Sequence, residues 1–396
     1  MAIETDVSEL RERQKAKNKR NFLIKFFAVL TAALLVVIAV LTKDSWYPYL
    51  DGILTKVPAV TTLENSENAV LAEGLFPISI EGGADYQLKA MDNYFAVLDD
   101  SRFMVYSTDG EKVTEKQHAY ANPILTVSDK KALIYDLGGN SFSLESKYKT
   151  VYEKTCDETI LLAELSSSDL AAVVTKSEKY LAQLDVYDAN GKRLLTYKSH
   201  DSRITGVTFL NDNSGCIITT LDAESGDIHC GLICLSFGSD EQVWQSDYSS
   251  CLAVSTMTDE NGNIIIIGDS KCVCFNSDGF AEAVHEYDDT IIDYTHSSKL
   301  TAVLLENTDI RRYNLLITSS TDITNPHTVT LPEEAKHIEA ADNMVYVLTN
   351  SGIYTYNELG QEMSGVKLFD SYDNFCKIGN YFFLMGYDEI NRISFN

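Results

Sequence analysis

Basic side chains are scarce in this 396-residue sequence, in which 32 Lys and Arg stand against 58 Asp and Glu. A nucleic-acid partner needs cations against its phosphates, so this deficit argues against nucleic-acid binding. The basic residues are also unevenly distributed, because seven of them lie within residues 1–25. The remainder holds 25 basic and 54 acidic residues, which predicts a soluble domain that repels anionic surfaces.

Motifs of the common catalytic and metal sites are also missing. The seven His residues form no HExxH or HxH pair, and the sequence has neither a GxSxG elbow nor a GxxxxGK[ST] phosphate loop. The segments 211–215 (NDNSG) and 258–262 (TDENG) look like calcium loops, but they lack the bidentate Glu of an EF-hand. Turn chemistry explains them better. We therefore expect no catalytic residue, no metal site and no cofactor.

One long apolar run lies near the N-terminus, at residues 22–42. As a helix it would be about 32 Å long, close to the roughly 30 Å hydrocarbon core of a bilayer. Basic residues precede the run, and Trp46 and Tyr47 follow it, so it predicts a transmembrane helix whose N-terminal side is cytoplasmic. The run is longer than the apolar region of a signal peptide and no small-x-small site follows, which favours an uncleaved signal anchor.

These features predict four parts along the chain. Residues 1–21 form a short basic cytoplasmic tail, and residues 22–42 form the transmembrane anchor. Residues 43–74 form a polar stalk, and residues 75–396 form the external domain. The protein is thus expected in the cell membrane as a single-pass protein with an extracytoplasmic C-terminal domain.

A short turn motif recurs four times in the external domain, as YSTDGE at 106–111, YDANGK at 187–192, FNSDGF at 275–280 and YNELGQ at 356–361. The copies are 81, 88 and 81 residues apart, so each gap equals two units of 40–44 residues. Four short strands in each such unit are typical of a β-propeller blade. The sequence predicts an all-β, eight-bladed β-propeller, with seven blades as the alternative if the unit at 123–160 is absorbed differently.

The aromatic residue and the glycine of each turn have structural roles in this interpretation. Glycine supplies the positive φ that a tight hairpin needs, and the aromatic ring packs at the edge of the blade. The residues are Tyr106 with Gly110, Tyr187 with Gly191, Phe275 with Gly279, and Tyr356 with Gly360.

The eighth unit begins near residue 371 and has room for only three strands. A closed propeller must complete that blade from elsewhere, because an open edge invites aggregation. In the segment 75–82 (LFPISIEG), Phe76, Ile78 and Ile80 alternate with other residues. We therefore expect this segment to be the outer strand of the eighth blade and to close the ring.

The eight cysteines lie in a domain that, if external, permits disulfides. They are Cys156, Cys216, Cys230, Cys234, Cys251, Cys272, Cys274 and Cys376. If residues 215–235 form a hairpin centred near Ser225, Cys216 lies opposite Cys234, and a disulfide between them is an open hypothesis. The alternative is that each cysteine is a small buried hydrophobic residue.

The turns resemble the repeats of quinoprotein-type (PQQ-like) eight-bladed propellers, and EQVWQS at 241–246 is similar to the Trp-bearing strand that follows the turn in those repeats. Residues 199–228 are similar to a WD40 repeat without the Trp-Asp ending. The whole layout resembles bacterial single-pass proteins with an external PQQ-like propeller and no assigned function. Quinoprotein dehydrogenases hold their cofactor with a Cys-Cys pair and a Trp. Here no such pair exists and Trp244 is the only Trp beyond the membrane edge, so the resemblance does not imply the cofactor.

The function expected from these features is a membrane-anchored extracytoplasmic module that binds or scaffolds protein or cell-envelope partners without catalysis. The alternative is an enzyme of degenerate quinoprotein or hydrolase type. Its site would lie in the propeller funnel, where polar residues from several blades converge. A sensor that signals through residues 1–25 is a third hypothesis.

Overall fold

The computed structural model describes residues 67–68, 74–81, 86–224, 227–239, 242–249, 251–341 and 343–395. These residues form strands and turns, and they contain no helix. Within this part of the chain, accordingly, no helix is long and apolar enough to cross a membrane. The predicted tail (1–21), transmembrane helix (22–42) and most of the stalk (43–74) lie outside the described residues.

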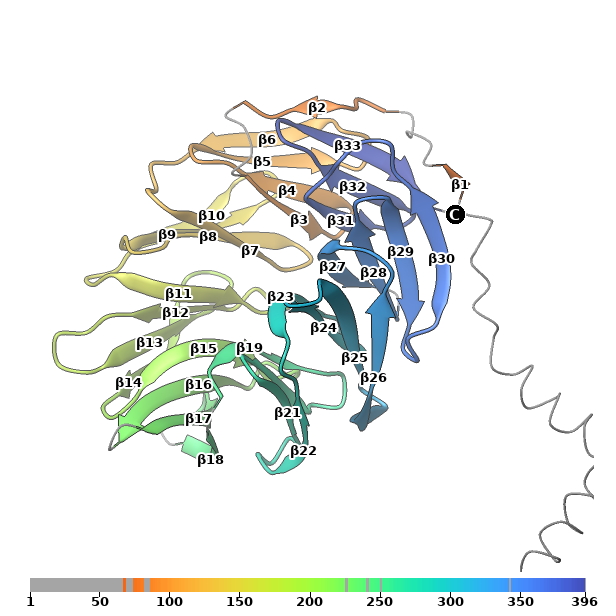
Figure 1. Cartoon of the computed structure of the whole chain (residues 1–396). Helices are drawn as coiled ribbons and strands as arrows, with labels where there is room; N and C mark the ends of the chain where they lie inside the picture. Colours follow the sequence, from red (N-terminus) through yellow and green to blue (C-terminus); the bar gives the residue numbers. More distant parts are fainter. Residues whose placement is uncertain are drawn as a thin grey trace, which may run out of the picture. The chain divides into compact units, whose positions relative to one another are not determined.

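The strands form eight sheets around a central axis, which we call blades I to VIII (Figure 1). Blade I contains β3 (Gln87–Met91), β4 (Tyr94–Leu98), β5 (Arg102–Ser107) and β6 (Lys112–Gln117). Blade II contains β7 (Pro123–Val127), β8 (Lys131–Asp136), β9 (Ser141–Ser146) and β10 (Thr150–Thr155). Blade III contains β11 (Ile160–Leu165), β12 (Ala171–Thr175), β13 (Ala182–Tyr187) and β14 (Arg193–Ser199). Blade IV contains β15 (Arg203–Phe209), β16 (Gly215–Glu224), β17 (Asp227–Ser236) and β18 (Gln242–Ser249).

The remaining blades follow in chain order, and the last two each gain a strand from the N-terminal part. Blade V contains β19 (Ala253–Thr258), β20 (Ile264–Gly268), β21 (Lys271–Phe275) and β22 (Ala281–Glu286). Blade VI contains β23 (Thr290–His296), β24 (Leu300–Asn307), β25 (Arg312–Ser319) and β26 (Asp322–Leu331). Blade VII contains β27 (Ala335–Ala341), β28 (Met344–Thr349), β29 (Gly352–Asn357) and β30 (Glu362–Lys367), with β1 (Glu67–Asn68) parallel to β30. Blade VIII contains β31 (Asn374–Ile378), β32 (Tyr381–Met385), β33 (Glu389–Ser394) and β2 (Ile78–Ser79).

The prediction of eight blades is confirmed, and the seven-bladed alternative is wrong. The weakest unit, at 123–160, forms blade II by itself, because β7 to β10 pair consecutively in antiparallel register. Strands β7 and β11 begin at residues 123 and 160, the bounds predicted for this unit. The 40-residue period is therefore the period of the blades.

The apolar core lies between the blades. The described residues form eight buried clusters, one at each junction of neighbouring blades. The two middle strands of a blade are covered on both faces, so they are apolar at nearly every position, as in β20 (IIIIG). The outermost strands have one face exposed to solvent, so exposed and less exposed residues alternate along much of the strand, as in β6 (KVTEKQ). This pattern predicts which strand of each unit is the outermost.

The recurring turns join the third and fourth strands of blades I, III, V and VII. Their glycines have positive φ, at +85° for Gly110, +81° for Gly191, +82° for Gly279 and +73° for Gly360. Each glycine also lies against a side chain at the outer edge of the preceding blade. A Cβ added at Gly279, for example, would lie 2.6 Å from the Trp244 ring on β18. The motif thus recurs in every second blade because it packs two successive blades together.

The aromatic residues of the same turns pack into the clusters between blades. The Tyr106 ring stacks on Phe95 with centroids 5.4 Å apart. Tyr187 lies 5.5 Å from Phe142 and Phe275 lies 6.1 Å from Tyr248, again between ring centroids. Tyr356 is buried in the cluster between blades VI and VII. None of them lines the central channel.

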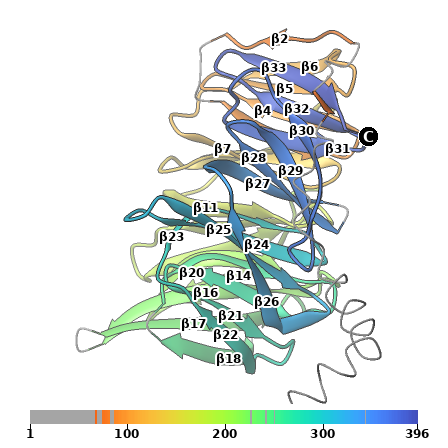
Figure 2. The same cartoon turned by 45° about the vertical axis from the view of Figure 1, so that its right-hand side comes forward.

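The N-terminal segment 74–81 lies along the outer edge of blade VIII. Ile78 pairs with Ile390 of β33, and the Ile80 N–H donates to the Asp388 carbonyl at 2.7 Å. β2 consequently runs beside β33 (Figure 2). Ile78 and Ile80 are buried and Ser79 between them is exposed, so the alternation in LFPISIEG sets the inward face.

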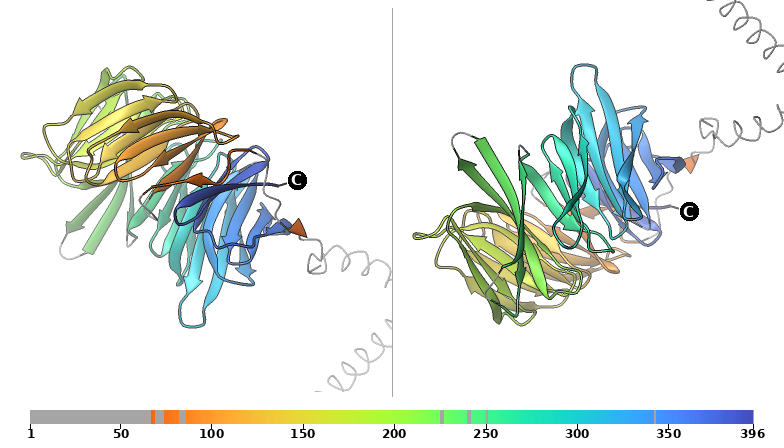
Figure 3. Two further views of the ribbon diagram at one scale, coloured as in Figure 1. Left: turned by 90° about the horizontal axis from the view of Figure 1, so that it is seen from above. Right: turned by 90° about the horizontal axis from the view of Figure 1, so that it is seen from below.

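The same segment also contacts blade I. The Leu75 N–H donates to the Asp109 carbonyl at 2.9 Å. The buried Arg392 guanidinium of β33 donates to the Thr108 carbonyl and, at 3.0 Å, to the Asp109 carboxylate. It also lies 5.0 Å from the Phe76 ring centroid. The turn YSTDGE of blade I is therefore fastened to the last blade, which lies beside it in Figure 3.

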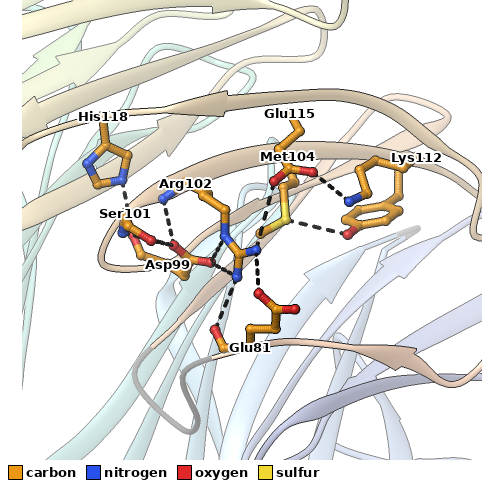
Figure 4. A network of polar contacts seen from close by, with 9 residues as sticks. Glu81, Asp99, Ser101, Arg102, Met104, Lys112, Glu115 and His118 are labelled. Atoms are coloured by element: carbon orange, nitrogen blue, oxygen red, sulfur yellow. Dashed lines mark hydrogen bonds and ion pairs between the residues drawn. The ribbon is translucent and has the colours of Figure 1, made fainter.

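A polar network fixes the other end of the closing segment (Figure 4). The Arg102 guanidinium lies 3.0 Å from the Asp99 carboxylate within blade I and 3.0 Å from the Glu81 carboxylate, just after β2. Glu115 lies 3.8 Å away and pairs with Lys112 at 2.6 Å. Burial of Asp99 raises its pKa, but hydrogen bonds from Ser101 and Arg102 outweigh burial and hold that pKa below its usual value.

Replacing Arg102 by Gln is expected to lower the free energy of unfolding by about 1–3 kcal/mol, because the buried Asp99 carboxylate loses its charged partner. Urea unfolding at neutral pH measures the change. Arg312→Gln is the control, because Arg312 is an exposed arginine at the start of β25. Equal midpoints for the two variants would contradict a stabilising role for the network.

The cysteine prediction needs a correction. The β16–β17 hairpin pairs Cys216 with Leu235 and Ile217 with Cys234, one residue away from the register that would place the two cysteines opposite each other. A shift by one residue turns a side chain to the other face of the sheet. Cys216 therefore packs toward blade III and Cys234 toward blade V, and both are free thiols.

Candidate functional site at the channel mouth

The first strand of each blade lies nearest the central axis, and a side chain on such a strand reaches solvent chiefly through the channel or its mouths. The exposed side chains within these strands include Lys89 on β3, Glu164 on β11, Val254 on β19, and Ile292 and Tyr294 on β23. These residues combine both charges with apolar and aromatic surface. Side chains of varied chemistry therefore reach solvent along the inner strands.

Side chains also bridge the inner strands of neighbouring blades. The Gln87 amide donates to the Pro123 carbonyl at 2.8 Å and accepts from the Leu125 N–H at 2.9 Å. The Asp293 carboxylate accepts from the Ile338 N–H at 2.9 Å and lies 2.7 Å from His337 Nδ1. The inner edge of a blade has backbone groups without a strand partner, and these side chains satisfy them.

Glu339 makes a similar bridge between blades VII and VIII. Both of its carboxylate oxygens lie 3.1 Å from the Lys377 N–H, which donates to them. Burial raises the pKa of Glu339 to about 7, although this hydrogen bond and the charges of Lys89 and Lys377 act in the opposite direction. Glu339 is therefore part of the scaffold of the channel.

A cavity of about 500 Å³ opens where the inner strands of blades III to VI end. Its polar lining consists mainly of hydroxyl and amide groups, from residues such as Thr205, Thr208, Asn211, Ser255, Thr256 and Thr258. Glu164, Val254, Tyr294 and His296 complete the wall. The Thr258 hydroxyl donates to the Asn211 amide oxygen at 3.2 Å, and the Thr256 hydroxyl bonds to that of Thr219 at 2.8 Å. The cavity therefore offers mainly the remaining acceptor capacity of these oxygens beside exposed apolar surface.

His296 is held in place by its neighbours. Its Nε2 lies 2.8 Å from the Thr258 carbonyl and its Nδ1 lies 2.9 Å from the Thr301 hydroxyl. Burial lowers the pKa of His296, so the ring is neutral, with Nε2–H donating to the carbonyl and Nδ1 accepting from the hydroxyl. Both ring nitrogens therefore have hydrogen-bond partners within the protein.

Glu164 is the acidic group of the cavity. Its carboxylate reaches the water of the channel, yet protein surrounds it on most sides, and this burial raises its pKa to about 7 against the opposing charge of Lys89. The charge of Lys89 is the influence that favours the ionised form of Glu164. Glu164 can accept hydrogen bonds or face a cation.

Sequence reasoning missed these residues for a clear reason. The chain has 58 carboxylates, and nothing in their spacing distinguishes Glu164. Its signal is its place next to the end of an inner strand, which is known only once the blade boundaries are set. The described residues also contain no group of three or more His, Cys, Asp or Glu side chains that could hold a metal ion.

The buried Glu339 carboxyl, which bridges blades VII and VIII, predicts how the free energy of unfolding depends on pH. Its folded pKa of about 7 is above the ordinary 4.5, so the folded chain binds this proton more tightly than the unfolded chain. The free energy of unfolding should therefore fall as pH rises from about 4.5 to about 7. Glu339→Gln should reduce this slope and be more stable than the parent protein at about pH 8, as measured by urea unfolding across the range.

Glu115→Gln is the control, because its effect on the free energy of unfolding should depend on pH in the opposite direction. A hydrogen bond from Lys112 holds the pKa of Glu115 below its usual value, so this group contributes stability that is lost as pH falls. An unchanged slope in Glu339→Gln would show that the carboxyl is already ionised in the folded protein.

Comparison with known proteins agrees with this architecture. A model of the family of unknown function DUF5711 matches residues 77–395. Among solved structures, BamB from Moraxella catarrhalis is 13% identical with a TM-score of 0.55, covering 83% of this chain and 98% of that chain. Sqt1 from Saccharomyces cerevisiae is 11% identical with a TM-score of 0.59, covering 84% and 100%. The dihydro-heme d1 dehydrogenase NirN, solved in complex with DHE, is 11% identical with a TM-score of 0.56, covering 83% and 79%.

At these identities the likeness establishes the fold alone, because unrelated functions share the propeller architecture. No curated protein matches the sequence. The functional assignment therefore depends on the residues of the channel and the faces of the blades.

Proposed function

We propose that this chain, which belongs to the DUF5711 family of unknown function, is a membrane-anchored extracytoplasmic module that binds protein or cell-envelope partners. The observation that carries the proposal is the cavity at the channel mouth. Hydroxyl and amide groups line it beside the exposed Val254 and Tyr294, and His296 is already engaged. Such a wall suits recognition by hydrogen bonds and apolar contact. The apolar run at 22–42, with basic residues before it, supports the anchor.

The location is tested with a C-terminal tag on the full chain in intact cells. If the propeller is extracytoplasmic, externally added protease or an impermeant label reaches the tag without lysis. A tag that becomes accessible only after the membrane is opened would refute the external location.

The binding role is tested by cross-linking in membranes followed by purification of the tagged chain. Tyr294→Ala removes an aromatic ring from the cavity wall and should abolish capture of a specific partner. Tyr148→Ala is the matched control, because Tyr148 is 67% exposed in the turn between β9 and β10, away from the cavity. Equal capture by both variants would exclude the channel mouth as the binding site.

An enzyme of hydrolase or degenerate quinoprotein type is the second candidate, and Glu164 is the observation in its favour. A carboxyl with a pKa of about 7 in a cavity could donate a proton near neutral pH. Turnover of a substrate by the parent protein that Glu164→Gln abolishes would support this candidate over the binding module.

A further inference from the structure

The charge of the propeller is concentrated in two neighbouring blades. Residues 203–288, which span blades IV and V, hold 14 acidic and two basic side chains. Residues 121–201, which span blades II and III, hold 12 acidic and 10 basic ones. Solubility alone does not require such a division, since both pairs of blades are similarly placed in the ring. The acidic pair also carries exposed apolar side chains, including Val243 at 60% and Phe280 at 69% exposure.

A groove of about 530 Å³ lies between blades IV and V. Among the described residues, its charged lining side chains are all acidic, and they come from three different turns. Asp212 lies between β15 and β16, Glu260 between β19 and β20, and Asp278 between β21 and β22. Val243 and Trp244 of β18 provide the apolar wall.

Trp244 is fixed against the turn that carries Asp278. A Cβ on Gly279 would lie 2.6 Å from its ring, and the Ser246 hydroxyl of the same strand donates to the Gly279 carbonyl. The indole is partly exposed at the groove. A rigid aromatic ring beside carboxylates is the setting in which an Arg or Lys side chain gains both cation–π and charge-assisted contacts.

None of the cationic side chains in the described part of the chain forms an ion pair with these three carboxylates. Asp212 accepts from the Ser214 N–H at 2.9 Å and from its hydroxyl at 2.7 Å, which holds the pKa of Asp212 below its usual value. Glu260 accepts from the Ser320 hydroxyl at 3.2 Å. The groove therefore stays negative at neutral pH.

We propose that this groove binds a basic, Arg- or Lys-bearing segment of a polypeptide partner. The inference rests on the proposed function and specifies the chemistry of the partner. The acids lie on separate turns, and the described residues form no metal-binding group, so an extended polycation fits them better than a single metal ion. Leu210 and Asn211 line both the groove and the channel cavity, so a segment in the groove leads to the channel mouth.

The test uses the full chain in detergent with Trp46→Phe, which leaves Trp244 as the sole tryptophan and hence as a reporter in the groove. A hexa-arginine peptide is titrated at about 0.15 M salt, while tryptophan emission and peptide anisotropy are followed. The groove variant is Asp212→Asn/Glu260→Gln/Asp278→Asn. The control, Asp100→Asn/Asp129→Asn/Glu178→Gln, makes the same change in net charge at exposed acids of blades I to III.

The expected result is a change in Trp244 emission on binding, about tenfold weaker affinity in the groove variant, and less than about twofold change in the control. An equal loss of peptide affinity in the two variants would overturn the proposal, because net charge alone would then explain binding. Unchanged Trp244 emission on peptide binding would also overturn it, because the peptide would then bind elsewhere. Spermine binding as tightly as the peptide would also overturn it. Peptide binding by the purified chain does not depend on its membrane topology. A failed binding test would therefore leave the proposed extracytoplasmic location untouched, and a C-terminal tag found in the cytoplasm would not contradict binding in the groove.

Discussion

Replacing Ile80 by Asp is expected to prevent the propeller from closing. Ile80 is 3% exposed, in the cluster that also contains Phe95 of blade I and Phe383 of blade VIII. An aspartate there would be buried without a partner or would have to leave the cluster, and either outcome costs several kcal/mol. That is a large part of the roughly 5–15 kcal/mol by which a domain is stable.

The effect should be large because the closure has few hydrogen bonds. β2 pairs through only two residues, and the Ile80 N–H bond to Asp388 extends that pairing by one step. Without the inward side chains, β33 becomes an exposed edge and the apolar junction of blades VIII and I opens to water. Exposed edges and apolar junctions promote association between chains.

The experiment compares Ile80→Asp with Ser79→Asp. Ser79 is the neighbouring residue and is exposed, so its variant has the same new charge without burial. Urea unfolding and size-exclusion chromatography should show a folded monodisperse control and an aggregated or unfolded Ile80 variant. Similar unfolding midpoints for the two would show that the segment 74–81 does not hold the ring closed.

The blades could be predicted from the sequence because the strand pattern, the turn residues and the repeat length all indicate the same units. Buried middle strands such as β20 are uniformly apolar, and the turn containing Gly279 needs a residue that tolerates positive φ. Those signals are local and repeat every 40 residues. The short closing strand is found by counting, since the last unit lacks a fourth strand.

The residues of the proposed binding surfaces could not be predicted in the same way. Glu164, Tyr294 and Asp278 acquire their setting from blades that are distant in sequence, and each looks like an ordinary surface residue in its own strand or turn. The register of β16 and β17 shows a second limit. Moving the centre of the hairpin by half a residue shifts the pairing of its two strands by one residue. The sequence does not fix the centre that closely, so it cannot say which residue lies opposite Cys216.

Replacing Gly279 by Ala is expected to lower the free energy of unfolding by about 3 kcal/mol, through two separable effects. Positive φ disfavours any L side chain by about 1–2 kcal/mol, and a methyl group 2.6 Å from the Trp244 ring adds an overpacking cost of about 1–3 kcal/mol. Gly138→Ala isolates the first effect, because Gly138 has a φ of +84° and a Cβ there would have no atom within 4 Å.

A double-mutant cycle with Trp244→Ala isolates the second effect. If the methyl group and the indole compete for one space, the cost of Gly279→Ala should fall to that of Gly138→Ala once the indole is removed. Urea unfolding of the four proteins gives the coupling energy. Equal costs of Gly279→Ala with and without Trp244 would mean that the ring moves aside freely. In that case the turn would not fix the aromatic wall of the groove between blades IV and V, and hexa-arginine binding there would depend on the carboxylates alone.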